Sequence, residues 1–181
     1  MPIQIGQKKE SDFTDPLGLL SDCHRRIEHF LAVLIRLCDK AKGGSLEADE
    51  RELLDKASTY FRNAAPKHTA DEEQSLFPRL RASAESEAPL ARLTELEFEH
   101  VLAARWHEIV DSLATRWLSE GSLASEQSVS MTHALKRLSE IYGRHIAVED
   151  RELFPLANRL LRPDELAAVG REMAERRGLK V

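Results

Sequence analysis

Two stretches of the chain, HTADEEQSLFP at residues 68–78 and HIAVEDRELFP at residues 145–155, are copies of one pattern. They share six of eleven positions, H, A, E, L, F and P, under a single shift of 77 residues. In each copy a glutamate follows a histidine by four positions, a spacing that puts both side chains on one face of a helix. The helical segments before the copies also align, His24 with His100, at a shift of 76. The repeat predicts two helical hairpins related by a pseudo-twofold axis, each of which contributes two histidines and one glutamate.

Apolar residues recur with helical spacing through most of the chain. The pair Asp15-Pro16 predicts a helix start, because proline is favoured at the first position after an N-cap. The apolar pattern and its glycine and proline breaks predict helices at about 16–42, 45–81, 89–120 and 125–161, and a short one at 163–177. Pro66 is expected to kink the second helix or split it in two.

No stretch alternates with a period of two residues over a useful length, so we expect no strands. The prediction is an all-α fold, an antiparallel up-down-up-down four-helix bundle with a short extra C-terminal helix. We divide the chain into an N-terminal tail at 1–14, the bundle at 15–161, and a C-terminal helix at 162–181 packed on or flanking the bundle.

Composition excludes several classes of partner. A length of 181 residues suits a single domain, and a net charge of -5 provides no basic surface for nucleic acid. The longest apolar run, residues 30–35, is far shorter than the roughly 20 residues that cross a bilayer. We therefore expect neither nucleic acid nor a membrane as a partner. No hydrophobic signal region follows Met1, which predicts a cytoplasmic location.

Chain lengths place the four histidines of the repeat at one level of the bundle. Antiparallel neighbours lie at equal depth when they are equally far from their connecting turn. From a turn near residue 44, His24 lies 20 positions back and His68 lies 24 positions forward. From a turn near residue 122 or 123, His100 and His145 each lie about 22 positions away.

Four imidazoles and two carboxylates in one small volume form a ligand set for two first-row metal ions. If these six residues were only polar core residues that satisfied one another, their burial would carry desolvation costs, and no positive charge would compensate those costs. Mixed nitrogen and oxygen ligation without thiolate favours iron first and manganese second. The sequence therefore predicts two iron ions as cofactors, with manganese or zinc as alternative occupants.

The combination of motifs resembles the hemerythrin-like, or His/His/Glu cation-binding, domain family. The resemblance covers about residues 16–161 and rests on the histidine of the first helix, the two HxxxE motifs, the LFP that follows, and Glu99-His100. It implies the four-helix fold and a di-iron site in which Glu72 and Glu149 are the bridging carboxylates. The ligand positions that it implies are His24, His68, Glu72, His100, His145 and Glu149.

The chain departs from the oxygen-carrying members of that family at one position. Those members have a second histidine four residues after the first on the third helix, where this chain has Ala104. Glu28, four residues after His24, is the counterpart of Ala104 under the repeat and a candidate seventh metal ligand, with a salt bridge as its alternative role. The carriers place the last carboxylate five residues after its histidine, so Asp150 is the substitute ligand if Glu149 points away.

Two further polar residues lie near the predicted ligands on the same helical stripes. His107 follows His100 by two turns and is interpreted as a hydrogen-bonded core histidine or as a support for a metal ligand. Tyr142 precedes His145 by one turn and either donates its hydroxyl toward the site or packs in the core.

The leading functional hypothesis is a non-haem di-iron protein of hemerythrin type. It binds dioxygen or a related small oxidant for sensing, storage or oxidative-stress handling. The alternatives are a di-iron or iron–manganese oxidase or peroxidase, and a metal-responsive iron-homeostasis module. The missing histidine at Ala104 favours enzymatic turnover, because a less saturated site invites an oxidant. A homodimer or an unidentified protein partner is left open.

Overall fold

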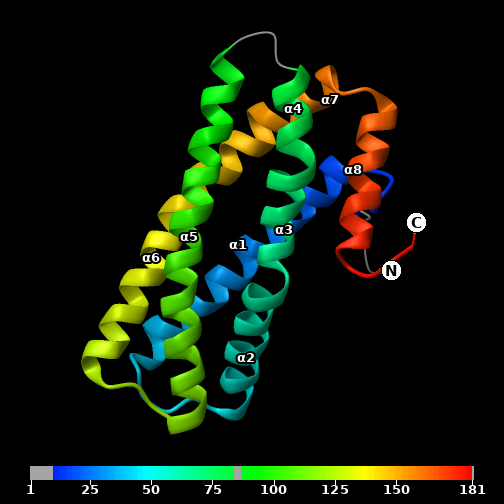
Figure 1. The fold of residues 1–181 in the computed structure, drawn as a ribbon. Coiled ribbons are helices and arrows are strands. Elements are labelled where there is room, and N and C mark those ends of the chain that lie inside the picture. Colours follow the sequence, from blue (N-terminus) through cyan, green and yellow to red (C-terminus); the bar gives the residue numbers. More distant parts are fainter. Residues whose placement is uncertain (1–9, 84–86, 181) are drawn as a thin grey trace, which may run out of the picture.

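The computed structural model describes residues 10–83 and 87–180, without the side chains of residues 87–90. Within these ranges every regular element is a helix and no strand occurs, which confirms the all-α prediction (Figure 1). The elements are α1 Pro16–Ala41, α2 Ala48–Asn63, α3 Ala65–Asp71, η1 Glu72–Leu76, α4 Phe77–Ser83, α5 Glu87–Glu120, α6 Ser125–Val148, η2 Glu149–Leu153, α7 Phe154–Leu160 and α8 Pro163–Glu175.

The four longest helices form a closed ring of contacts. Helix α1 packs against α2 and α6, and α5 packs against the same two helices on the other side. Their connecting turns meet at one end, where the backbone N–H of Leu123 donates to the carbonyl of Gly43 at 2.7 Å. Gly43 has a φ of 81°, and a Cβ there would lie 2.9 Å from Cβ of Ser128. Only glycine suits a position that needs both a left-handed backbone and a close neighbour.

The second predicted helix is split, as expected from Pro66. Helix α2 ends at Asn63, and α3 begins at Ala65 with the proline in its first turn. A proline is tolerated there because the first N–H groups of a helix have no partner within the helix.

Among the residues that the structure describes, buried apolar side chains form two clusters. One cluster includes Ile27 and Trp117, and the other includes Leu20 and Phe77. On α1, His24 lies between Leu20 and Ile27 and is itself only 1% exposed. A layer of buried polar side chains therefore separates the two apolar clusters.

Both copies of the repeated motif contain a π-helical turn that the sequence did not predict. Phe77 N–H donates to the carbonyl of Glu72, and Phe154 N–H donates to the carbonyl of Glu149, each five residues back instead of four. A proline follows each phenylalanine. A proline ring clashes with the carbonyl four residues before it, and a wider turn relieves that conflict. The proline of the LFP sequence thus accounts for a wider turn just before it, and in each copy that turn begins at the glutamate.

The chain on either side of the ring packs against it. Helix α8 contacts α1, α3 and η1. Residues 10–14 lie close to α8 and α1, with the carbonyl of Phe13 directly over Gly170 and the N–H of Ser11 donating to Asp22 at 2.6 Å. The remainder of the predicted N-terminal tail, residues 1–9, lies outside the described residues. None of the described helices is long and apolar enough to cross a membrane.

Candidate metal centre

A buried layer of histidine and glutamate side chains brings the six predicted ligands together. Their ligand atoms form two overlapping groups, each with all its atoms within 4.8 Å of one another. Glu72 and Glu149 belong to both groups. The first group is His24, His68, Glu72 and Glu149, and the second is Glu72, His100, His145 and Glu149.

The six residues come from six different elements. His24 lies on α1, His68 on α3, His100 on α5 and His145 on α6, while each glutamate is the first residue of a π turn. Both glutamates are 0% exposed and no histidine of the set exceeds 8%. The centre therefore depends on α1, α5 and α6 and on the segments that follow α2 and α6 in the chain.

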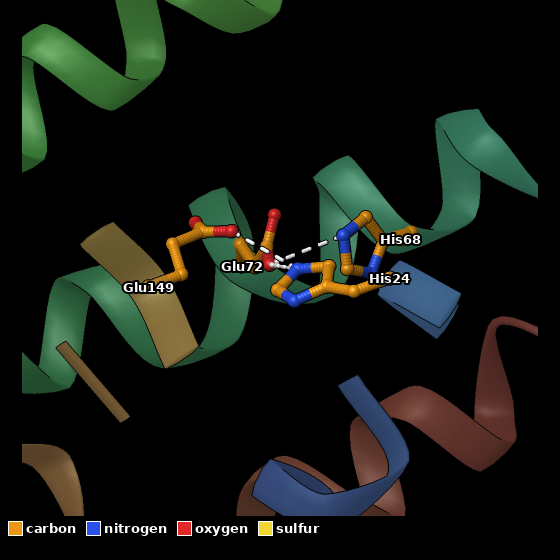
Figure 2. Close-up of side chains that lie close together, drawn as sticks. All are labelled: His24, His68, Glu72 and Glu149. Carbon is orange, nitrogen blue, oxygen red and sulfur yellow. Dashed lines mark ion pairs between the residues drawn. The ribbon is translucent and has the colours of Figure 1, made fainter. Parts of the chain in front are cut away.

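Glu72 lies among three of the histidines, and Glu149 lies between two of them. Oε1 of Glu72 is 3.8 Å from Nε2 of His24 and 3.3 Å from Nε2 of His68, while its Oε2 is 3.3 Å from Nε2 of His100. Oε2 of Glu149 is 3.0 Å from Nε2 of His24 and 3.2 Å from Nε2 of His145. Figure 2 shows His24, His68 and the two carboxylates converging on one point.

The electrostatics of the layer favour positive charge between these atoms. Burial favours the uncharged form of Glu72, but the neighbouring imidazoles of His68 and His100 hold the pKa of Glu72 well below its usual range. Burial also disfavours a proton on His24, but the pKa of His24 is raised to about 12 by the carboxylates of Asp150, Glu149 and Glu72. Burial, by contrast, lowers the pKa of His68. Protons on only part of the imidazole set thus balance the buried carboxylates, and metal cations perform the same task more fully.

The inward-facing atoms are ion-pair neighbours of one another, but most of them make no hydrogen bond of good geometry. Within the described part of the chain, no hydrogen bond reaches either oxygen of Glu72 or Glu149, or Nε2 of His24 or His100. Buried polar atoms are nearly always satisfied, so such a group needs an explanation. Two cations between the histidine pairs would satisfy these atoms together, and the residues present therefore fit a metal centre.

In three of the four histidines, the outer ring nitrogen Nδ1 contacts a carboxylate. Nδ1 of His24 lies 3.0 Å from Oδ1 of Asp150, and Nδ1 of His100 lies 2.8 Å from Oε1 of Glu73. Nδ1 of His145 lies 3.1 Å from Oε2 of Glu99. A carboxylate on the outer nitrogen fixes the ring and leaves Nε2 free to bind metal.

The sequence motifs assign no role as a ligand support to Glu73 or Glu99, although both adjoin predicted ligands in the chain. Asp150 was considered only as a substitute for Glu149. The structure places it on the outer nitrogen of His24, and Glu149 points inward.

Glu28 is not brought to the centre. Its side chain is exposed, while Ile27 beside it is 1% exposed and holds the inward position on α1. The inward stripe of α1 runs through Leu20, His24, Ile27 and Leu31, so a residue four after His24 has already rotated outward. We therefore leave Glu28 out of the candidate ligand set.

The two other polar candidates lie beside the centre, not in it. Neither His107 nor Tyr142 belongs to the two groups of ligand atoms. Nε2 of His107 lies 2.8 Å from the hydroxyl of Tyr142. Ala104, where the oxygen carriers have a histidine, is exposed.

Fold and site together define a class: an all-helical protein with a buried histidine and glutamate centre that can hold cations. The family model described as the hemerythrin HHE cation binding domain matches residues 15–157. A Haemophilus influenzae protein described only as uncharacterized is 33% identical over 173 residues, which cover 93% of each chain. The chain belongs to the hemerythrin HHE cation-binding family.

Proposed function

We propose that the chain is a non-haem di-iron protein of hemerythrin type that binds dioxygen or a related small oxidant. The observation that carries this proposal is the pair of overlapping ligand groups that share Glu72 and Glu149. One ion would be held by His24 and His68 and the other by His100 and His145, with the two glutamates common to both. Sensing, storage or the handling of oxidative stress are the roles that we propose for it.

The proposed scaffold is an antiparallel four-helix bundle over residues 15–161 with an added C-terminal helix at 162–181. Two short turns, one after α1 and one after α5, support it because they join helices that pack together. Helices α1, α3, α5 and α6 and the two π turns, which carry the candidate ligands, then surround the metal centre.

The donor set supports iron as the occupant. Imidazole and carboxylate ligands without thiolate suit iron, with manganese and zinc as alternatives. When bound, iron supplies the change of oxidation state by which dioxygen or a peroxide is bound or reduced. The protein supplies the buried ligands, their orientation, and apolar clusters on both sides that restrict water.

Metal analysis of the loaded chain tests this proposal. Reconstitution with ferrous iron without oxygen should give about two irons per chain, and exposure to oxygen should then raise absorption in the near ultraviolet. His68→Ala and His145→Ala should each lose one iron or both. His133→Ala is the matched control, because His133 is exposed on α6 and lies outside both ligand groups. Equal metal content in all three variants would overturn the site assignment.

A second candidate function is an oxidase or peroxidase that uses the same centre. It is favoured by Ala104, which leaves α5 with no ligand beyond His100 and lines a cavity that reaches that histidine. A more open metal would turn over an oxidant instead of only binding it. Catalytic consumption of hydrogen peroxide by the iron-loaded chain would support the enzyme, whereas slow autoxidation of a stable oxygenated form would support the carrier.

A further inference from the structure

The cavity that reaches His100 has a volume of about 420 Å³ and lies beside the metal centre. It is enclosed by α2 and α3 on one side and by α5 and α6 on the other. His100 is one of its lining residues, so the cavity extends to one of the proposed metal ligands. Ala104 also lines it and is exposed, which shows that the cavity opens to solvent through the position where the oxygen carriers have a histidine.

The walls of this cavity are mostly apolar. Phe61, Ala65, Pro66, Ala103 and Ala104 contribute hydrocarbon surface. The ring of Phe61 lies 4.5 Å from that of His107, measured between ring centres. Pockets of roughly 300–1,000 Å³ with apolar walls and a few polar groups are typical of small-molecule sites. A volume of about 420 Å³ far exceeds the roughly 30 Å³ occupied by one water molecule in the liquid.

Among the polar residues of the lining, His107 and Tyr142 form a hydrogen-bonded pair. The hydroxyl of Tyr142 lies 2.8 Å from Nε2 of His107, and both residues line the cavity. Burial lowers the pKa of His107 to about 4, so the ring is neutral near pH 7. A hydroxyl that donates to a neutral imidazole keeps its oxygen free to accept a further hydrogen bond. The pair can therefore recognise one hydroxyl group without holding a net charge.

Charges at the rim argue against an anionic ligand. Arg62 is paired with Asp111 at 2.7 Å, and Glu108 adds a second carboxylate to the lining. The three groups sum to a net charge of about −1, and Arg62 is already paired with Asp111, so an incoming anion would have to compete with that carboxylate. Transfer of an ionised group into such a cavity is costly, whereas an uncharged molecule avoids that cost.

We propose that this cavity binds a small uncharged organic molecule with an apolar ring and one hydroxyl group, of which a simple phenol is the model. The ring lies against Phe61 and Ala104, and the hydroxyl contacts Tyr142 beside His107. The site places such a molecule next to His100, and thus beside the metal centre. Binding itself does not require metal, so the inference goes beyond the proposed function.

The test uses fluorine NMR of 4-fluorophenol with the full chain after loading with zinc, which is diamagnetic. Bound probe should show a broadened signal, and the titration should saturate. 4-Fluorobenzoate, which is similar in size but charged, and fluorobenzene, which lacks the hydroxyl, should each bind about tenfold more weakly. No broadening of the 4-fluorophenol signal, or equal binding of the benzoate, would overturn the proposal.

Two variants assign the binding to this cavity. Ala104→Leu fills it and should weaken 4-fluorophenol binding by about tenfold or more. Ala32→Leu makes the same change at an exposed site on α1 outside the cavity lining, and should bind like the wild type. Tyr142→Phe keeps the aromatic ring at position 142 but removes its hydroxyl, so it should abolish the preference for 4-fluorophenol over fluorobenzene. Unchanged binding by Ala104→Leu would refute the assignment.

Zinc content measured on the same samples separates this proposal from the proposed function. A chain that lacks zinc but binds the phenol in an Ala104-dependent way would support the cavity and contradict the metal centre. A chain that holds two zinc ions but does not bind the phenol would support the metal centre and contradict the cavity.

Discussion

Asp150, in the second copy of the repeat, holds His24 of the first hairpin, with Oδ1 3.0 Å from Nδ1. The mirrored contact joins Glu73, in the first copy, to His100 of the second hairpin at 2.8 Å. Glu73 and Asp150 are equivalent under the shift of 77 residues. Each hairpin therefore fixes a histidine that belongs to the other, and the two halves can complete the centre only together.

Because each hairpin holds a histidine of the other, we predict that the carboxylates on the outer Nδ1 nitrogens control metal affinity. Asp150→Ala and Glu73→Ala should each weaken metal binding by about 10- to 100-fold, because the free imidazole loses its fixed orientation and some basicity. Competition against a chelator of known affinity measures the change. Glu152→Ala is the control, since this carboxylate lies in the same π turn as Asp150 but is 59% exposed. Equal affinities for all three variants would contradict the prediction.

The centre is not fully symmetric, and the difference predicts two unequal ions. His145 has Glu99 on Nδ1 at 3.1 Å, whereas Nδ1 of His68 has no hydrogen-bond partner among the described residues. Under the shift that aligns His24 with His100, Cys23 stands where Glu99 would be needed. We expect the ion at His24 and His68 to bind about tenfold more weakly than the ion at His100 and His145.

A stepwise metal titration measures this difference. The wild type should load in two resolved steps, and Glu99→Ala should bring the steps together by weakening the tighter one. A single step in the wild type would show that the outer contact of His145 has no effect on affinity.

The two residues that follow α8 contact Asp71, the residue directly before Glu72. This carboxylate is 0% exposed and pairs with Arg176 at 2.8 Å and with Arg177 at 2.7 Å. Arg176 also donates to the hydroxyl of Ser75 within η1 at 2.6 Å. The C-terminal helix is thereby joined to the π turn that begins with a candidate ligand.

Asp71→Ala should lower the free energy of unfolding by about 2–3 kcal/mol, because two partly buried arginines lose their partner. Chemical denaturation at a fixed metal content measures the loss. Glu140→Ala provides the comparison, since Glu140 pairs with Arg137 at 2.6 Å on an exposed face and should cost less than about 1 kcal/mol. Similar losses in both variants would mean that α8 contributes no more than a surface contact.

Local chain chemistry was sufficient to predict much of this fold and the inner centre. Asp15-Pro16 marks the start of α1, Pro66 marks the break after α2, and the HxxxE spacing puts His68 and Glu72 together on one helical face. Each of these signals acts within a few residues, where helix geometry fixes the outcome.

The outer contacts depend on packing and were not predictable in the same way. Asp150 and His24 are 126 positions apart, and their contact exists only because α1 packs against α6. Glu28 shows that spacing alone can also mislead. Its spacing from His24 fits HxxxE, but it lies outside the buried apolar stripe of α1 and is exposed. Spacing identifies which residues share a face, and packing decides which of them point inward.

His107 predicts how stability depends on pH. Burial lowers its pKa to about 4 in the folded chain, while an unfolded histidine titrates near 6.5. Between these values the unfolded chain binds a proton that the folded chain does not, so acid favours unfolding. The contribution is fully present above about pH 6.5, and up to about 3 kcal/mol is lost as the pH falls to about 4.

His107→Phe should flatten this part of the pH profile, because the ring keeps its packing near Phe61 but can no longer take up a proton. Free energies of unfolding from denaturant titrations between pH 4 and 7 give the comparison, and the difference between variant and wild type cancels the effect of the metal ligands. His133→Phe replaces an exposed histidine and should follow the wild type. A profile for His107→Phe as steep as that of the wild type would show that His107 is not held neutral beside Tyr142.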